Sequence, residues 1–108
     1  MVTVGLLIRL EAKPGKEDEV AKQLAAAIDV VNKEEGTTAW FALRFGPASF
    51  GVFDAFPDDT ARQVHLSDNL GAMQAAVGEL VVAAPTVEPA DVLVAKLPGR
   101  QDGRPRLP

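Results

Sequence analysis

The feature of this sequence that most limits its possible folds is the way the spacing of its apolar residues changes along the chain. Four segments alternate apolar and other residues, or are rich in aromatic and β-branched residues, which is typical of strands. Two segments repeat their apolar residues every three or four positions, which is typical of amphipathic helices. The order is strand, helix, strand, strand, helix, strand. The expected strands are Val2–Glu11, Thr38–Phe45, Ser49–Phe56 and Val87–Leu97.

Local signals indicate where the two helices begin and end. The turn 13–15, Lys-Pro-Gly, interrupts the first strand pattern, and the acidic residues 17–19 follow where a helix dipole favours negative charge. Asp58 is the expected N-cap of the second helix, because its side chain can accept a free N–H group of the first turn. We expect Gly36 to follow the end of the first helix and Pro85 to stop the second.

This order of elements predicts an α+β fold of the ferredoxin-like β-α-β-β-α-β type. The sheet has four antiparallel strands, and both helices lie on one face. One domain is expected to span residues 1–97. The helical residues expected to face the core are Val20, Leu24, Ala27, Ile28 and Val31, followed by Leu70, Met73, Val77, Leu80 and Val81.

Several predicted strands carry apolar residues on both faces. In the second strand, Trp40 and Ala42 alternate with Phe41, Leu43 and Phe45. A sheet that is apolar on both sides has to be covered on both sides, and the two helices cover only one of them. We therefore expect a homodimer in which the open sheet face is covered by a second copy of the chain.

The composition excludes several functional classes. The chain has no cysteine and one histidine, which removes thiolate chemistry and leaves no predicted metal site or cofactor. The net charge of −4 disfavours nucleic acid as a partner. No apolar run is long enough to span a membrane, and the N-terminus lacks the pattern of a signal peptide. We expect a cytoplasmic protein without a membrane partner.

The last residues, 98–108, form a basic tail rich in glycine and proline. They contain three arginines, Arg100, Arg104 and Arg106. Two interpretations are open. The tail is either a solvated terminus or a flap that lies on a partner subunit.

Three stretches of the sequence carry a family resemblance. They are Pro14–Val20 after the first strand, Glu35–Trp40 at the entry to the second strand, and Val52–Ala61 followed by His65. In this order and spacing they resemble the antibiotic biosynthesis monooxygenase-like family. The resemblance covers most of the expected domain. It implies a dimeric α/β barrel and, in some members, cofactor-free oxidation of phenolic, quinone-forming substrates.

Other members of this family degrade haem, and many have no assigned activity. The haem-degrading branch uses an Asn on the first strand, a Trp in the second helix and an axial His farther along. The nearest positions in this chain are Ile8, His65 and Ala75. Because none of them matches, the resemblance does not extend to haem degradation.

His65 is the candidate catalytic residue, because its ordinary pKa lies near neutrality. If it lines a cleft between the second helix and the sheet, it can take a proton from a phenol or quinol. The resulting electron-rich anion can then react with oxygen without a metal. The alternative is a helix histidine that hydrogen-bonds a neighbour or lies on the surface.

Five further residues are candidates for binding a substrate. Trp40 can stack on a planar ligand, although such a residue is more often part of the core. Asp54 needs a partner if it is buried, and Arg9 or Arg44 on an adjacent strand can supply one, as an interface ion pair. The substrate-binding candidates are Trp40, Phe45, Phe56, Asp54 and Arg44.

Two functions follow as hypotheses. The first is a cofactor-independent monooxygenase-like protein that binds a small aromatic substrate of the phenol or quinol type between sheet and helices. The second is a non-catalytic dimer of the same fold, which binds a small ligand or has a structural role. An open cavity beside His65 favours ligand binding, and a filled core there favours the structural role.

Overall fold

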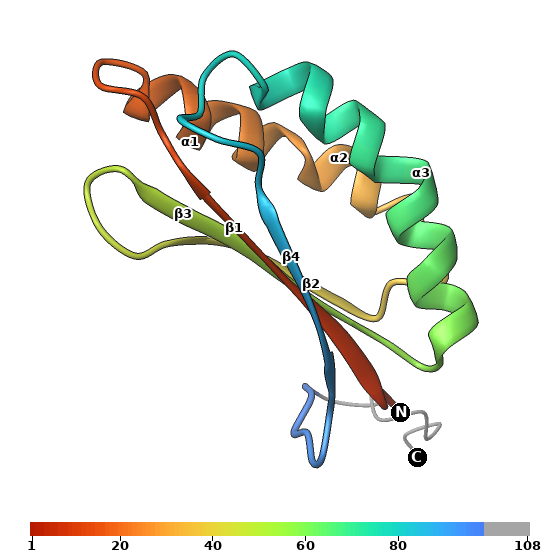
Figure 1. Cartoon of the computed structure of the whole chain (residues 1–108). Helices are drawn as coiled ribbons and strands as arrows, with labels where there is room; N and C mark the ends of the chain where they lie inside the picture. Colours follow the sequence, from red (N-terminus) through yellow and green to blue (C-terminus); the bar gives the residue numbers. More distant parts are fainter. Residues whose placement is uncertain (99–108) are drawn as a thin grey trace.

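A four-stranded antiparallel sheet, covered by helices on one face, forms the described part of the chain, residues 1–98 of the computed structural model (Figure 1). The strand order is β2-β3-β1-β4, which confirms the predicted ferredoxin-like arrangement. The predicted tail lies outside the described residues from Gly99 onward. The elements are β1 (Val4–Glu11), α1 (Glu17–Ala26), α2 (Ile28–Val31), β2 (Ala39–Arg44), β3 (Ser49–Phe56), α3 (Asp59–Val77) and β4 (Thr86–Asp91).

The register of the strands determines which side chains share a face of the sheet. Leu6 and Trp40 are both paired with Asp54, one from each neighbouring strand. Residues paired in this way point to the same side of a sheet. Leu6, Trp40 and Asp54 therefore lie on one face, together with the buried Ile8 and Val52. This is the face that the helices cover.

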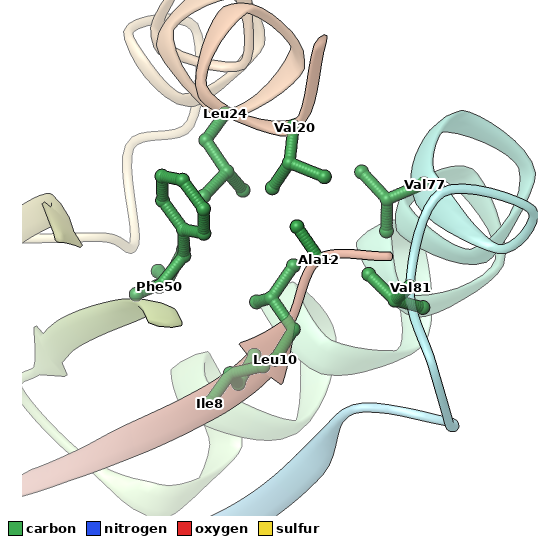
Figure 2. Close-up of a cluster of buried hydrophobic side chains, with 9 residues drawn as sticks. Ile8, Leu10, Ala12, Val20, Leu24, Phe50, Val77 and Val81 are labelled. Atoms are coloured by element: carbon green, nitrogen blue, oxygen red, sulfur yellow. The ribbon is translucent and has the colours of Figure 1, made fainter. Parts of the chain in front are cut away.

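The hydrophobic core lies between this face and the helices. Figure 2 shows Val20 and Leu24 of α1 pointing toward Leu10 of β1 and Phe50 of β3, with Val77 of α3 beside them. Each of these side chains is no more than 4 % exposed. The cluster occupies the end of the sheet where β1 finishes, and the opposite part of the same face lies under α2 and the first half of α3 (Figure 1).

The first predicted helix begins where expected but is divided. The turn before it contains Gly15 at φ +85°, a backbone conformation that favours glycine. At Ala27 the N–H donates to the carbonyl of Leu24, a tighter turn that separates α1 from α2. Two predictions are wrong. Ile28 was expected to face the core but is 39 % exposed. The helix was expected to end just before Gly36 but ends at Val31, with Asn32 as its C-cap.

The second predicted helix also begins where expected. Asp58 is its N-cap, and Oδ1 accepts the N–H of Ala61 at 2.9 Å. The helix ends at Val77 and not at Pro85, because the chain leaves it to bring Val81 into the core and into a bridge with Ala12. None of the helices within residues 1–98 combines the length and apolar character that crossing a bilayer requires.

The last strand is shorter than predicted. β4 pairs with β1 only from Thr86 to Asp91, and Pro89 lies inside it, opposite Leu6. Strand pairing does not continue to Leu97, and Leu93 and Val94 in the following segment are 91 % and 90 % exposed. The pairing ends at Asp91, opposite Val4, with one more backbone hydrogen bond from the Val92 N–H to the Thr3 carbonyl at 2.9 Å.

The face of the sheet that carries no helix has an apolar cluster on β2 and β3. Phe41 and Phe45 are 53 % and 50 % exposed, and the half-buried Phe53 pairs with Phe41 across the strands. The Phe45 ring lies so close to Gly51 that a Cβ on that glycine would come within 2.8 Å of it, while the Arg9 guanidinium lies 4.8 Å from the ring centre. Glycine here allows an aromatic ring to lie flat against the strand.

The N-cap of α3 provides a test of this local structure. Asp58→Ala removes the acceptor for the Ala61 N–H and is expected to lower the free energy of unfolding by about 1 kcal/mol. Asp68→Ala, an exposed site in the same helix, is the matched control and should have little effect, because alanine favours helix. Urea denaturation of both variants measures the difference. Equal stability of the two would contradict the capping role.

Candidate functional site

A cavity of about 260 Å³ lies between the sheet and the helices. Its walls come from residues 23–31 of α1 and α2, residues 65–77 of α3, and four side chains of the sheet. Most of the lining is apolar. The polar exceptions are Gln23, the indole of Trp40, Asp54, His65 and Asn69. The cavity therefore has the character of a small-molecule site, which combines apolar walls with a few convergent polar groups.

His65 is part of the wall of this cavity, and both of its ring nitrogens face carboxylates. Nδ1 is 2.6 Å from Oε1 of Glu34, and Nε2 is 2.9 Å from Oδ2 of Asp54. The residue is 7 % exposed, and its ring packs at 47° against Phe56 with the centroids 5.2 Å apart. The imidazole is thus fixed on three sides. Such a ring has one orientation, and a ligand reaches its nitrogens only by displacing a carboxylate.

Glu34 is itself held by neighbours in the loop before β2 and in α3. Oε1 accepts a hydrogen bond from the Thr37 hydroxyl at 2.8 Å, and Oε2 accepts one from Nδ2 of Asn69 at 2.7 Å. Asn69 also donates to the carbonyl of His65, 2.8 Å away and one helical turn earlier. These contacts orient Glu34 toward Nδ1 of His65. Glu34 is therefore the group that orients the imidazole.

Asp54 is the most deeply buried polar side chain of the site. It is 0 % exposed, in the middle of β3, and it lines the cavity. Oδ2 is within ion-pair distance of His65, yet neither oxygen has a hydrogen bond of good geometry within residues 1–98. The 2.9 Å separation is therefore an ion-pair contact and not a hydrogen bond, because a short distance alone does not align an N–H with an acceptor. Asp54 thus has acceptor capacity left over.

The two carboxylates control the protonation of His65. Burial alone would lower the pKa of His65, but the polar contacts and negative charges of Asp54 and Glu34 outweigh it and raise the pKa above 6.5. Burial would raise the pKa of Glu34, but its hydrogen bonds with Asn69, Thr37 and His65 lower it below 4.5. The site therefore favours an imidazolium next to an ionised Glu34.

The structure places the predicted site residues in different environments. Trp40, Asp54 and His65 come together at the cavity, and Phe56 lies behind the His65 ring. Arg44 is exposed, donates to the carbonyls of Gly46 and Pro47, and lies over Phe50. Phe45 lies on the open face of the sheet. The partner of the buried Asp54 is His65 and not Arg9 or Arg44, which corrects the arginine pairing expected from the sequence.

Sequence reasoning missed Glu34, Asn69 and Thr37. Asn69 follows His65 by four residues, so both lie on one face of α3, and this spacing could have pointed to it. Glu34 has no comparable signal, because a loop brings it to His65 from 31 positions away. In residues 1–98 no group of three or more histidine, cysteine or acidic side chains is arranged to hold a metal ion.

The fold and the buried site define a ferredoxin-like α+β protein, and comparison with solved structures identifies its family. The protein NE2512 of Nitrosomonas europaea, of unknown function, is 49 % identical, with a TM-score of 0.86 over 92 % of this chain and 97 % of that chain. A Caulobacter crescentus protein named "putative antibiotic biosynthesis monooxygenase" is 25 % identical, with a TM-score of 0.72 over 86 % and 92 % of the two chains.

More distant structures share the fold alone. Rv0793 of Mycobacterium tuberculosis is 19 % identical, with a TM-score of 0.74 over 86 % of this chain and 97 % of that chain. No family model matches the sequence, and no curated protein matches it either. From the fold and these relatives, the chain belongs to the antibiotic biosynthesis monooxygenase-like family.

The raised pKa of His65 predicts how stability depends on pH. A group whose pKa is higher in the folded state stabilises that state fully below its unfolded pKa, here about 6.5, and this contribution is lost as pH rises through the folded pKa. We expect the free energy of unfolding of the wild type to fall over this interval. His65→Gln, which cannot titrate, should lack this fall.

Urea denaturation from about pH 5.5 to about pH 9 measures the difference. This range stays above the ionisation of Glu34, whose lowered pKa contributes stability that is lost only on acidification. Parallel pH profiles for the wild type and His65→Gln would show that His65 gains no protonation on folding.

Proposed function

We propose that the chain is a cofactor-independent monooxygenase-like protein that binds a small phenol or quinol in the cavity between sheet and helices. The observation that carries the proposal is the cavity of about 260 Å³ with a buried, ionisable His65–Asp54 pair at one end and apolar walls elsewhere. This volume lies just below the range for small-molecule sites, which begins at about 300 Å³, and so suits a small ligand. The name of the Caulobacter crescentus relative supports the reaction type.

The reaction requires only the substrate and oxygen. A phenol with a free para position plus O₂ gives the para-quinone plus water. The substrate supplies all four electrons: one oxygen atom forms the new C=O bond and the other leaves as water. The hydroxyl proton is removed first, a C–O bond to dioxygen forms at the para carbon, and the loss of that carbon's hydrogen as a proton accompanies O–O cleavage.

The residues at the cavity suit the first of these steps. We assign this proton to the His65–Asp54 pair, which is part of the cavity wall. A general base contributes typically about 10²–10⁴-fold to such a step. The Trp40 indole offers a surface for stacking an aromatic ring, and the apolar walls keep water from the reactive anion.

The second candidate function is a non-catalytic dimer of the same fold that binds a small ligand or has a structural role. One observation favours it: both nitrogens of His65 are engaged by carboxylates, as in a histidine that fixes a loop and a helix to the sheet. In this case the cavity binds aromatics without turnover.

Oxygen consumption separates these functions. With 1-naphthol, whose para position is free, as substrate, we expect the wild type to consume oxygen and His65→Ala to lose that activity. Ser67→Ala, an exposed site in the same helix, is the matched control and should keep it. Because His65→Ala leaves the buried Asp54 without its partner, activities are compared well below each variant's melting temperature. Undiminished activity in His65→Ala would remove His65 from the reaction.

The homodimer remains part of the proposal. The open sheet face exposes Phe41 and Phe45 around the half-buried Phe53, and Leu93 and Val94 add apolar surface after β4. A second copy of the chain on this face would remove these side chains from water, with about 25 cal/mol gained for each Å² of apolar surface buried. The cytoplasmic location and the absence of a nucleic-acid partner remain predictions.

A charge on the open face tests the dimer. Phe41→Asp is expected to convert the dimer into a monomer, because an aspartate within an apolar interface would have to be buried unpaired. Val64→Asp on the outer side of α3 is the control, since Val64 is 55 % exposed, much like Phe41. Sedimentation equilibrium gives the masses. A monomeric wild type would overturn the proposed dimer, and a Phe41→Asp variant that stays dimeric would place the interface elsewhere.

A further inference from the structure

We infer that Asp54, and not His65, is the residue that contacts the ligand: its carboxylate accepts a hydrogen bond from a hydroxyl group of the ligand, while His65 and Glu34 are positioning residues. The inference rests on the proposed function only in taking the cavity as the ligand site. It concerns binding, so it can be tested without turnover. Three observations carry it.

The first observation is that His65 has no nitrogen available. Glu34 Oε1 lies 2.6 Å from Nδ1, and Asp54 Oδ2 lies 2.9 Å from Nε2. The Thr37 hydroxyl and Nδ2 of Asn69 are each 3.3 Å from Nδ1, so they also block a ligand from reaching this nitrogen. With a carboxylate against each ring nitrogen, neither nitrogen is open to a ligand. A hydroxyl donor in the cavity therefore has no acceptor on this ring.

The second observation is that Asp54 has acceptor capacity and faces the cavity. Its side chain is 0 % exposed, it is part of the cavity wall, and neither oxygen has a well-aligned hydrogen bond within residues 1–98. A buried carboxylate offers about four lone-pair directions, and the one polar contact of Asp54 found within residues 1–98 is the ion pair of Oδ2 with His65. A buried carboxylate without a hydrogen-bond donor is unfavourable, so a hydrogen bond from a ligand hydroxyl would stabilise Asp54.

The third observation is the charge of the residues that line the cavity. Among the described residues that line the cavity there is no lysine or arginine, and the charged groups are Asp54 and His65, which offset each other. Asn69, the amide nearest to His65, already donates to Glu34. A ligand carboxylate would therefore add a further negative charge beside His65, whose charge Asp54 and Glu34 already offset. The ligand class that fits is a neutral aromatic with a hydroxyl donor, not an aromatic acid.

The test compares three probes, 1-naphthol, naphthalene and 1-naphthoate, whose binding is followed by fluorescence titration at about pH 7. We expect the wild type to prefer 1-naphthol over naphthalene by about tenfold or more, as for a hydrogen bond to a charged group, and to reject 1-naphthoate. Asp54→Asn, which keeps the shape but not the charge, should lose most of this preference. His65→Gln should keep a preference, because Asp54 is still present.

Glu34→Gln tests the positioning role. The quantity measured is the pH midpoint of 1-naphthol binding, which does not depend on the stability of the fold. The groups that face His65 are the carboxylates of Glu34, from the loop before β2, and of Asp54, from β3, with the neutral Thr37 and Asn69 beside them. Without the Glu34 charge, the midpoint of the pH dependence of 1-naphthol binding should shift to lower pH. Naphthalene binding should not change.

The outcomes separate this inference from the proposed reaction. A 1-naphthol preference that depends on Asp54, in a protein that consumes no oxygen, keeps the inference and removes the monooxygenase activity. Equal binding of 1-naphthol and naphthalene by the wild type overturns the inference. So does a preference that disappears in His65→Gln and survives in Asp54→Asn, or an unchanged pH midpoint in Glu34→Gln. Failure of the wild type to bind either probe overturns it whatever the oxygen assay gives.

Discussion

The arrangement of this protein depends on the burial of one carboxylate in the middle of its sheet. An aspartate that is 0 % exposed would strongly destabilise a purely apolar core, so the fold has to bring a positive group to it. His65 is that group, and its charge is in turn fixed by Glu34. A strand, a helix and a loop from three parts of the chain are thereby joined by one imidazole ring, which supplies the polar end of the cavity.

The course of the backbone brings Asp54, His65 and Glu34 to the same place. The pairing of Asp54 with Leu6 and Trp40 directs it to the helix-covered face, beside an aromatic wall. The N-cap at Asp58 fixes where α3 begins, and His65 follows about two turns later, above β3. The division of the first helix at Ala27 then lets α2 and the following loop approach α3, so that Glu34 reaches the outer nitrogen of His65.

Much of the fold could be predicted from the sequence because it depends on local signals. Alternation gave the bounds of β3, and the capping potential of Asp58 gave the start of α3, both of which are confirmed. Asp54 was recognised as a buried charge that needs a partner, but its partner could not be identified, since pairing across 11 residues depends on how α3 lies over the sheet. The contact of Glu34 with His65 could not be predicted for the same reason. The charged stretch 33–36, Lys-Glu-Glu-Gly, is typical of an exposed loop and does not indicate that one of its carboxylates points inward.

The proline within β4 has a consequence for how such a chain avoids uncontrolled association. β4 is an edge strand of the sheet, and Pro89 has no N–H group to offer to a neighbouring chain. Edge strands that carry proline are poor templates for the addition of further strands, and this protects against fibril-like stacking of sheets side by side. The apolar cluster on the open face is therefore separate from the edge of the sheet. Association of two copies through the open face need not lead to aggregation through hydrogen bonds between edge strands.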